Sequence, residues 1–324
     1  MKPLRTPFFS EHFNLYQVAP GVLAAIAVPG GGAYSNAGII DIGGHTLIFD
    51  AFDTPQAAQD LYQAQKEYAS NDRVSILLSH HHSDHRTGLQ VFPGRFPVIS
   101  TRKTRQLVYE SDNDPDYSPE QELLEMGTYR ESLLSQLESQ KDPRWQTNLK
   151  ASISHLDKYI DAIPSIKTRF PDQTFEGEIT FFGSEVTAHL VHAGSGHTPS
   201  DSYLLLPRQK VAFIGDIGFF ECHPYLQDCD PDGLRAILRE LLEMDVETFI
   251  PGHGPPGSKK DLVLLVEYLD TLEEIAQQSV DVGVHEQELP EIDIPAPFDR
   301  WSFGINRFKP NIRFFCERLR PHSR

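Results

Sequence analysis

The stretch Ser79-His80-His81-His82-Ser83-Asp84-His85 decides how the rest of this 324-residue chain is interpreted. It follows directly on residues 74–78, a largely apolar run typical of a strand buried on both faces. Alternate residues on an extended backbone point the same way, so His80 and His82 can hold one ion, and Asp84 and His85, past the bend, can reach a second. Imidazole and carboxylate ligands suit zinc, iron or manganese. The stretch therefore predicts a metal centre, against the alternative of a solvated His-rich loop.

Three further ligand candidates follow, each where a strand is expected to end. His197 lies in the glycine-rich turn Gly194-Ser195-Gly196-His197-Thr198, and Asp216 closes the apolar run Phe213-Ile214-Gly215-Asp216. His253 lies in the turn of Ile250-Pro251-Gly252-His253-Gly254. Loops at strand ends can aim side chains into a cleft. Each signal is weak alone, but together with the first stretch they complete two coordination spheres.

In this order the four motifs resemble the pattern of the metallo-β-lactamase-fold hydrolase superfamily, in particular its group of glyoxylase-like or quinoprotein-relay-like zinc hydrolases. The resemblance covers roughly residues 16–278, apart from a helical insertion. It implies an α+β fold, a four-layer αββα sandwich with the metals in a cleft at one edge. It also implies the role of each ligand: His80, His82 and His197 on the first metal, Asp84, His85 and His253 on the second, and Asp216 as the bridge. Asp50 then supports the site from the end of a strand, with Asp41 as the rival for this position.

The resemblance implies a dinuclear metal-dependent hydrolase. Two divalent ions, zinc first with iron or manganese as alternatives, can share a hydroxide that acts as the nucleophile. Asp84, a ligand beside that nucleophile, is the expected catalytic proton acceptor. The expected reaction is cleavage of a small ester, lactone or thioester. Two alternatives stay open: a phosphodiesterase or nuclease with the same metals, and a non-catalytic metal-binding interaction protein.

The candidate substrate pocket is formed by residues that follow Asp216. Acyl-homoserine lactonases carry a Tyr three residues past the bridging Asp, whereas this chain has Phe219 there. Tyr225 is the nearest Tyr and could take the role of an oxyanion donor, against a plain packing role. His223 could line the pocket or be a hydrogen-bonded structural His.

The chain is expected to form a single domain over residues 1–324. Strands alternate with helices expected at 54–69, 230–244 and 258–278, which suggests two sheets with helices outside. Residues 101–170 are polar and helical in period, and are expected to form a helical insertion that serves as a lid or a dimer surface. The Pro-rich and aromatic residues 289–324 are expected to be an extension packed on the domain.

Composition limits the partners. With 39% hydrophobic and 23% charged residues the chain is globular rather than disordered. Its 29 Lys and Arg against 46 Asp and Glu give a net charge of −17, which disfavours nucleic acid and anionic membranes and leaves a small-molecule substrate. Three Cys are too few for a disulfide framework, residues 1–13 hold no apolar signal segment, and no run approaches the about 20 residues needed to span a bilayer. We expect a cytoplasmic protein, with a homodimer as an open alternative to the monomer.

Overall fold

The computed structural model describes residues 4–115, 117–283, 289 and 292–320. Parts of the expected N-terminal stretch (residues 1–3) and of the expected C-terminal extension (290–291 and 321–324) therefore lie outside the described residues. Within the described part, no helix is both long enough and apolar enough to cross a membrane.

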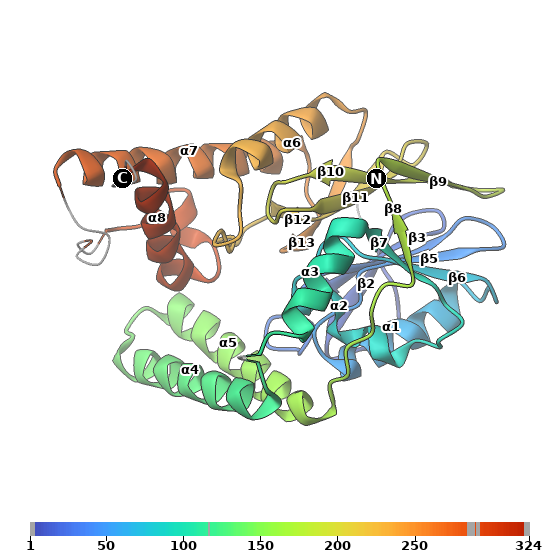
Figure 1. The fold of residues 1–324 in the computed structure, drawn as a ribbon, viewed down its shortest axis with the longest axis horizontal. Coiled ribbons are helices and arrows are strands. Elements are labelled where there is room, and N and C mark those ends of the chain that lie inside the picture. Colours follow the sequence, from blue (N-terminus) through green and yellow to red (C-terminus); the bar gives the residue numbers. More distant parts are fainter. Residues whose placement is uncertain (1–3, 116, 284–288, 290–291, 321–324) are drawn as a thin grey trace.

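Two β-sheets lie face to face in the middle of the molecule (Figure 1). The larger sheet holds strands β1 to β8 in chain order, antiparallel up to β5 and parallel from β5 to β8. Its strands are β1 (Leu4–Arg5), β2 (Phe13–Ala19), β3 (Val22–Ala27), β4 (Ala37–Asp41), β5 (Thr46–Phe49), β6 (Val74–Leu77), β7 (Val98–Thr101) and β8 (Gln173–Phe175).

The smaller sheet has the order β13-β12-β11-β10-β9, and only β12 and β13 run parallel. Its strands are β9 (Glu178–Phe182), β10 (Thr187–Gly194), β11 (Asp201–Leu206), β12 (Val211–Phe219) and β13 (Thr248–His253). The core between the sheets is aliphatic and aromatic, with Phe49 of one sheet 6.0 Å from Phe213 of the other, measured between ring centroids.

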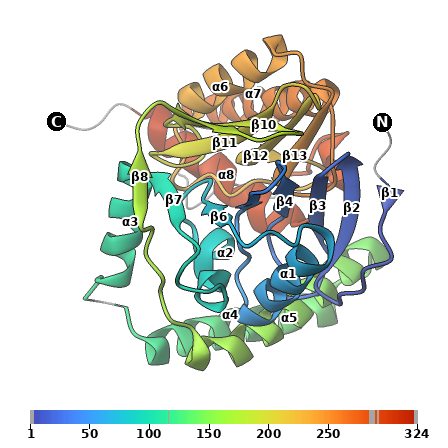
Figure 2. The same cartoon turned by 90° about the vertical axis from the view of Figure 1, so that its right-hand side faces the viewer.

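Helices cover the outer faces, so the expected four-layer αββα sandwich is confirmed (Figures 1 and 2). Helix α1 (Pro55–Tyr68) packs on the larger sheet, and α6 (Pro231–Glu243) and α7 (Lys259–Asp281) on the smaller one. Local sequence explains where α1 begins, because the Thr54 hydroxyl accepts a hydrogen bond from the Ala57 amide and Pro55 occupies the first helical position. The helix expected at 54–69 is thus present within a residue or two.

The connection from β7 to β8 contains the expected helical segment. It consists of α3 (Arg102–Asp112), α4 (Pro119–Ser139), α5 (Pro143–Ala162) and the short η2 (Ile163–Ser165). Helices α4 and α5 form a hairpin with a small apolar core of its own, which includes Leu133, Leu149 and Leu156. In both views this hairpin lies below the sandwich, apart from the sheets.

The C-terminal residues include a helix that the sequence pattern did not predict. After η4 (Phe298–Arg300), helix α8 (Gly304–Leu319) packs on α7 through residues such as Phe308, Ile312 and Phe315. Strand β2 was also not predicted, although its residues alternate between buried and less buried positions. The remaining short elements are α2 (Ser83–Arg86) and η1 (Thr87–Val91), which follow the His-rich stretch.

Strands β12 and β13 are longer than expected. The sequence suggested that the strand ends at Asp216, but β12 runs on to Phe219 with every residue buried. The pairing with β13 shifts register at Gly215, whose φ is +49°. A Cβ on Gly215 would lie 2.6 Å from the Cβ of Ser79, so glycine lets the strand pass close to the His-rich stretch. The irregularity directs Asp216 toward that stretch while the strand continues.

Candidate metal centre

Seven side chains from separate segments meet at one edge of the sandwich. His80 and His82 follow β6, Asp84 and His85 lie in α2, and His197 lies in the turn between β10 and β11. Asp216 lies within β12, and His253 is the last residue of β13. The ends of β6 and β13 and the β10–β11 turn therefore lie at the same edge, which explains why residues far apart in sequence gather here.

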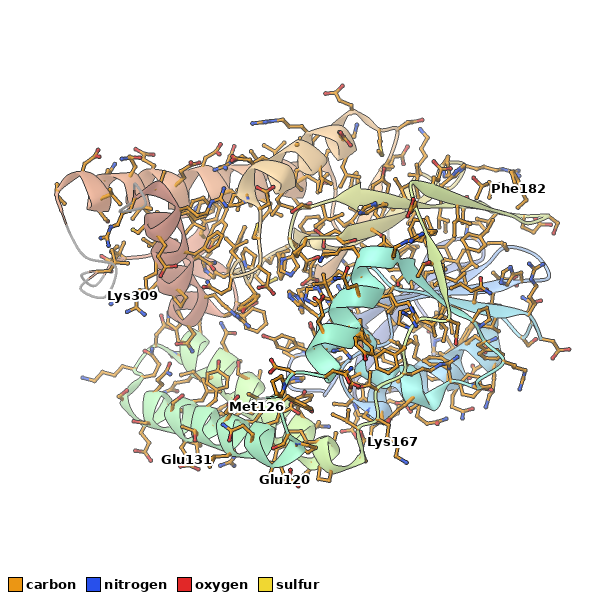
Figure 3. The ribbon with its side chains drawn as sticks, in the orientation of Figure 1. Glu120, Met126, Glu131, Lys167, Phe182 and Lys309 are labelled. Atoms are coloured by element: carbon orange, nitrogen blue, oxygen red, sulfur yellow. The ribbon has the colours of Figure 1, made fainter. Side chains whose placement is uncertain are left out.

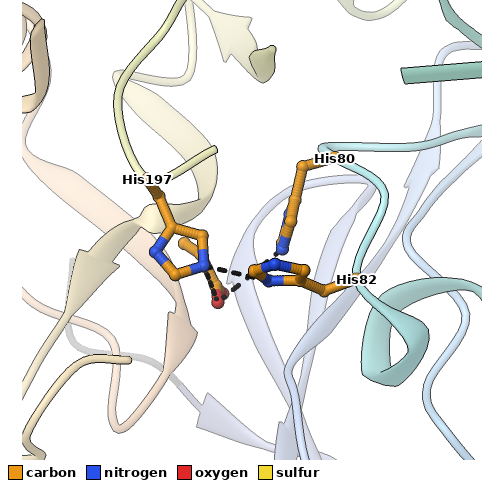
Figure 4. Close-up of side chains that lie close together, drawn as sticks. His80, His82 and His197 are labelled. Carbon is orange, nitrogen blue, oxygen red and sulfur yellow. Dashed lines mark hydrogen bonds and ion pairs between the residues drawn. The ribbon is translucent and has the colours of Figure 1, made fainter. Parts of the chain in front are cut away.

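The seven side chains form two groups of metal-ligating atoms. In the first group, one ligand atom from each of four residues lies within 4.8 Å of the others: His80, His82, His197 and Asp216. In the second group the same holds for Asp84, His85 and His253. Figure 4 shows the three imidazoles of the first group converging from two sides. The structure thus brings together all seven residues that the motifs singled out.

Asp216 contacts both groups. Its Oδ2 lies 3.2 Å from His197 Nε2 in the first group. Its Oδ1 lies 3.0 Å from His85 Nε2, and its Oδ2 3.4 Å from His253 Nε2, in the second. A carboxylate in this position can bind an ion on each side.

In four of the five imidazoles the ring nitrogen that faces away from the cluster is hydrogen-bonded to the protein, whereas His197 Nδ1 has no such partner. His85 Nδ1 donates to Asp50 Oδ2 at 2.8 Å, and His253 Nδ1 donates to the Tyr34 carbonyl at 3.0 Å. His82 is turned the other way: its Nε2 donates to Asp228 Oδ2 at 2.8 Å, and its Nδ1 lies 3.1 Å from His197 Nε2. Such bonds orient imidazoles for metal binding and leave one lone pair free for an ion.

Asp50, for which the sequence predicts a supporting role, lies beside the cluster. It is fully buried and accepts hydrogen bonds from the Ser79 amide (2.8 Å), the Ser79 hydroxyl (2.7 Å) and His85. The Ser79 hydroxyl in turn accepts from His80 Nδ1 at 2.9 Å. Asp50 therefore orients a ligand of each group, His85 directly and His80 through Ser79. Its rival Asp41 accepts from the Gly43 amide at the β4–β5 turn instead.

The electrostatics of the cluster favour a cation. Burial opposes charge on His85, but Asp216, Asp84 and Asp50 outweigh it and hold the pKa of this imidazole well above its ordinary value. Burial likewise opposes charge on His253, whose neighbours Asp216 and Asp84 raise its pKa to about 9. Burial disfavours the charged form of Asp216 too, yet the surrounding imidazoles hold its pKa well below the ordinary value. Without metal, protons on imidazoles balance the buried carboxylates.

The donor set fits divalent metal ions. Within the described residues, several buried polar atoms at the cluster lack a hydrogen-bond partner: His80 Nε2, His85 Nε2, His197 Nδ1 and Asp216 Oδ1. Buried polar atoms normally have partners, so this concentration needs an explanation. His80 Nε2, His85 Nε2 and Asp216 Oδ1 face the cluster, and His and Asp donors are those that zinc and related ions take.

The three candidate pocket residues line a cavity of about 270 Å³ beside the cluster. The Phe219 ring stacks on His253, with centroids 5.1 Å apart. His223 is a structural residue in its bonding, because its Nε2 donates to the Phe298 carbonyl and its Nδ1 accepts from the Tyr268 hydroxyl. Burial lowers its pKa to about 4. The Tyr225 ring lies 5.8 Å from His82 and carries the Arg307 guanidinium on its face, 4.9 Å from the ring centroid.

Sequence reasoning missed five residues of this cavity, one of which is Ser83 between the ligand candidates His82 and Asp84. Asp228, Phe303 and Arg307 line it, as does Tyr34, whose pKa burial raises to about 12 although the Arg307 charge opposes the shift. Arg307 and Phe303 come from the C-terminal segment, where no motif marks them. Asp228 could have been suspected as an acidic residue three positions after Tyr225, but the sequence offers no sign that it reaches His82.

Comparisons with known proteins agree with this geometry. A family model described as the metallo-beta-lactamase superfamily matches residues 30–253, a range that contains all seven ligand candidates and Asp50. No curated protein matches the chain.

Several solved structures share the fold at low sequence identity. A metallo-beta-lactamase from Pontibacter korlensis is 16% identical, with a TM-score of 0.56 over 80% of this chain and 99% of that one. The DIM-1 metallo-beta-lactamase is 14% identical, with a TM-score of 0.54 over 80% of this chain and 98% of its own. The inverting sec-alkylsulfatase Pisa1 from Pseudomonas sp. is 16% identical with a TM-score of 0.62, and the match covers 94% of this chain but only half of the sulfatase. From the matched family model, which spans more than half of the sequence and the whole ligand set, the chain belongs to the metallo-beta-lactamase superfamily.

Proposed function

We propose that this protein is a dinuclear metal-dependent hydrolase that cleaves a small ester, lactone or thioester. The observation that carries the proposal is the pair of ligand groups that share Asp216 and border an open cavity. Two divalent ions bound there, zinc in the first instance and iron or manganese as alternatives, would polarise the scissile carbonyl and lower the pKa of water toward about 7.

The chain's own residues have distinct tasks in this proposal. Asp84 is the catalytic proton acceptor, because it lines the cavity and its Oδ2 lies 3.1 Å from His253 Nε2 and 3.4 Å from His85 Nε2. Burial opposes the charge of this carboxyl, but those two imidazoles hold its pKa well below the ordinary value, so the carboxylate is ionised. Phe219 shields one side of the cluster from water, and Tyr225 provides a hydroxyl in the cavity that can donate to a developing oxyanion.

Metal analysis tests the site. The purified chain is expected to retain between one and two equivalents of transition metal, and His82→Ala to lose a large part of it. His189→Ala is the matched control, since His189 pairs with Glu178 on the smaller sheet and lies outside both ligand groups. Less than about one equivalent in the wild type, unchanged in His82→Ala, contradicts the proposal.

A substrate panel tests the reaction. We expect turnover of p-nitrophenyl esters, lactones or thioesters that His82→Ala abolishes. The panel includes bis-p-nitrophenyl phosphate, because a phosphodiesterase would use the same ligand set, and a secondary alkyl sulfate, because the alkylsulfatase fold matches 94% of the chain. Preference for the phosphate diester would replace the proposal by phosphodiester hydrolysis, and full metal loading without turnover on any member would favour a binding role.

A further inference from the structure

Arg307 lies where two cavities meet. The cavity at the metal cluster and a second cavity of about 340 Å³ share five lining residues: Tyr34, Ser83, Asp84, Phe303 and Arg307. The second cavity lies between the α4–α5 hairpin and the first turn of α8, and its other walls include Met126, Tyr129, Leu156 and Tyr159. A ligand that occupies both cavities would therefore lie beside Arg307.

The charge of Arg307 has no carboxylate partner within the described residues. It forms a hydrogen bond with the Tyr34 side chain and lies over the ring of Tyr225, and Tyr129 is a further neighbour. Arg235, by comparison, is buried and pairs with three carboxylates: Asp232, Asp270 and Glu273. In a chain with 46 acidic residues, an Arg in a cleft without such a pair stands out.

The acidic residues of the two cavities already have other partners. Asp84 faces His253, and Asp228 accepts from His82. In the second cavity, Glu122 accepts from the hydroxyls of Tyr117 and Tyr159, and Asp53 pairs with His155 at 3.0 Å. The guanidinium is therefore left as a donor directed at whatever enters between the cavities.

We propose that Arg307 is a specificity-determining residue that binds an anionic oxygen group, a carboxylate or a sulfate-like group, of the substrate. This inference rests on the proposed hydrolase function and names its substrate class: an ester with an acidic group near the scissile bond and an apolar part in the second cavity. A guanidinium presents a fork of donors that matches two oxygens, and a low-dielectric cleft strengthens such a bond. Arg307 itself lies outside residues 30–253, on this chain's C-terminal helix.

Paired substrates test the proposal. The p-nitrophenyl monoester of adipate carries a carboxylate, and its methyl ester is the neutral counterpart. We expect Arg307→Gln to lower the ratio of kcat/KM for the acid to kcat/KM for the neutral ester tenfold or more, mainly through KM, and Arg307→Lys to recover part of the loss. Lys309→Gln is the matched control, because it removes a positive charge from the same helix at a residue that lines neither cavity (Figure 3). An unchanged ratio in Arg307→Gln with full metal content overturns the proposal.

A binding measurement separates failure of this inference from failure of the proposed function. Calorimetry on the metal-loaded chain uses phenoxyhexanoate, its sulfonate counterpart and its neutral amide, none of which has an ester bond. We expect the wild type to bind an anion at least tenfold more tightly than the amide, and Arg307→Gln to lose this preference. The carboxylate and sulfonate arms show which oxygen group the subsite prefers. If no ester is turned over, the hydrolase proposal fails, but the binding measurement still tests the Arg307 subsite. The subsite proposal is refuted if the wild type binds the anions and the amide equally well. It is also refuted if Arg307→Gln keeps the full preference for the anions.

Discussion

Asp50 links the two ligand groups through hydrogen bonds. Its Oδ1 accepts from the Ser79 amide, and its Oδ2 accepts from the Ser79 hydroxyl and from His85 Nδ1. Its backbone has a φ of +61°, a conformation that costs energy for most residues but that Asp and Asn tolerate best. Burial raises the pKa of its carboxyl, while His85 and Ser79 oppose that shift. The backbone of Asp50 is thus strained, and its carboxylate is held where it accepts hydrogen bonds from His85 and Ser79.

Replacing Asp50 by Asn should weaken metal binding about 10–100-fold with little change of shape. If the amide oxygen keeps the bond to the Ser79 amide, the amide nitrogen faces His85 Nδ1, where two donors oppose each other. His85 then has to move its proton to Nε2, the atom that faces Asp216 and Asp84, and loses its lone pair toward the ion. Competition with a chromophoric chelator measures the affinity of both sites.

The matched control is Asp228→Asn, which removes the negative charge beside His82 alone and leaves a neutral amide oxygen as the acceptor. It is expected to weaken only one of the two sites, and by less, because Asp228 is 44% exposed and water can take its place. Equal chelator affinities for wild type and Asp50→Asn would show that Asp50 does not orient the ligands.

The seven residues of the cluster could be predicted from the sequence because four of them lie within residues 80–85 and because the four motifs together resemble a family pattern. The residues around them could not. Tyr34, Asp228 and Arg307 come from connections and from a C-terminal helix, and no local pattern marks them. Their place near the cluster depends on how three distant segments pack, which composition and periodicity do not encode.

At the scale of elements, the contact between α5 and α8 positions the second cavity. Gly304 begins α8 with a φ of +33°, and a Cβ there would overlap the ring of Trp145 in α5. We expect Gly304→Ala to lower the free energy of unfolding by about 1–3 kcal/mol, since both the ring and the backbone would have to shift. Urea unfolding of the metal-loaded chain measures this.

Gly127→Ala is the matched control for that variant. Gly127 lies inside α4 with open space at its Cβ position, so alanine there should stabilise the chain by about 0.5–1 kcal/mol. Combining Gly304→Ala with Trp145→Ala should cost less than the sum of the two single changes. Additive losses would show that the two residues do not restrict each other.

The predicted helices illustrate what local sequence can determine. Helices α1 and α7 were predicted close to their ends, and in the structure a Thr or Ser side chain caps the N-terminus of each. Helix α8 has no such cap: it begins after Phe303 in a left-handed conformation and contains Pro310. Its helical state depends on packing against α7, a tertiary effect that overrides weak local preference.

On the scale of the whole molecule, the C-terminal segment joins the body at His223. The family match ends at residue 253, yet His223, within the match, donates to the Phe298 carbonyl beyond it. The Tyr268 hydroxyl of α7 donates to the other ring nitrogen and itself accepts from Asn311 of α8 at 3.2 Å. This buried network connects the cavity wall to the helix that carries Arg307, so losing it should loosen the subsite as well as the fold.

The same network should make the fold sensitive to acid. Burial lowers the pKa of His223 to about 4, below the ordinary value near 6.5, so the unfolded chain binds the proton more readily. The stability that this neutral imidazole provides is complete above about pH 6.5 and is lost as the pH falls toward 4. Between pH 7.5 and 5 the loss in the free energy of unfolding amounts to about 2 kcal/mol.

The variant His223→Gln tests this pH dependence. A Gln side chain can donate to the Phe298 carbonyl and accept from the Tyr268 hydroxyl without titrating, so the free energy of unfolding of His223→Gln should fall by about 2 kcal/mol less than that of the wild type over this range. Urea unfolding of both proteins at the two pH values gives this difference, in which the acid lability of the metal ligands cancels because both chains share it. Equal losses of unfolding free energy in the two proteins would show that His223 does not cause the loss of stability in acid.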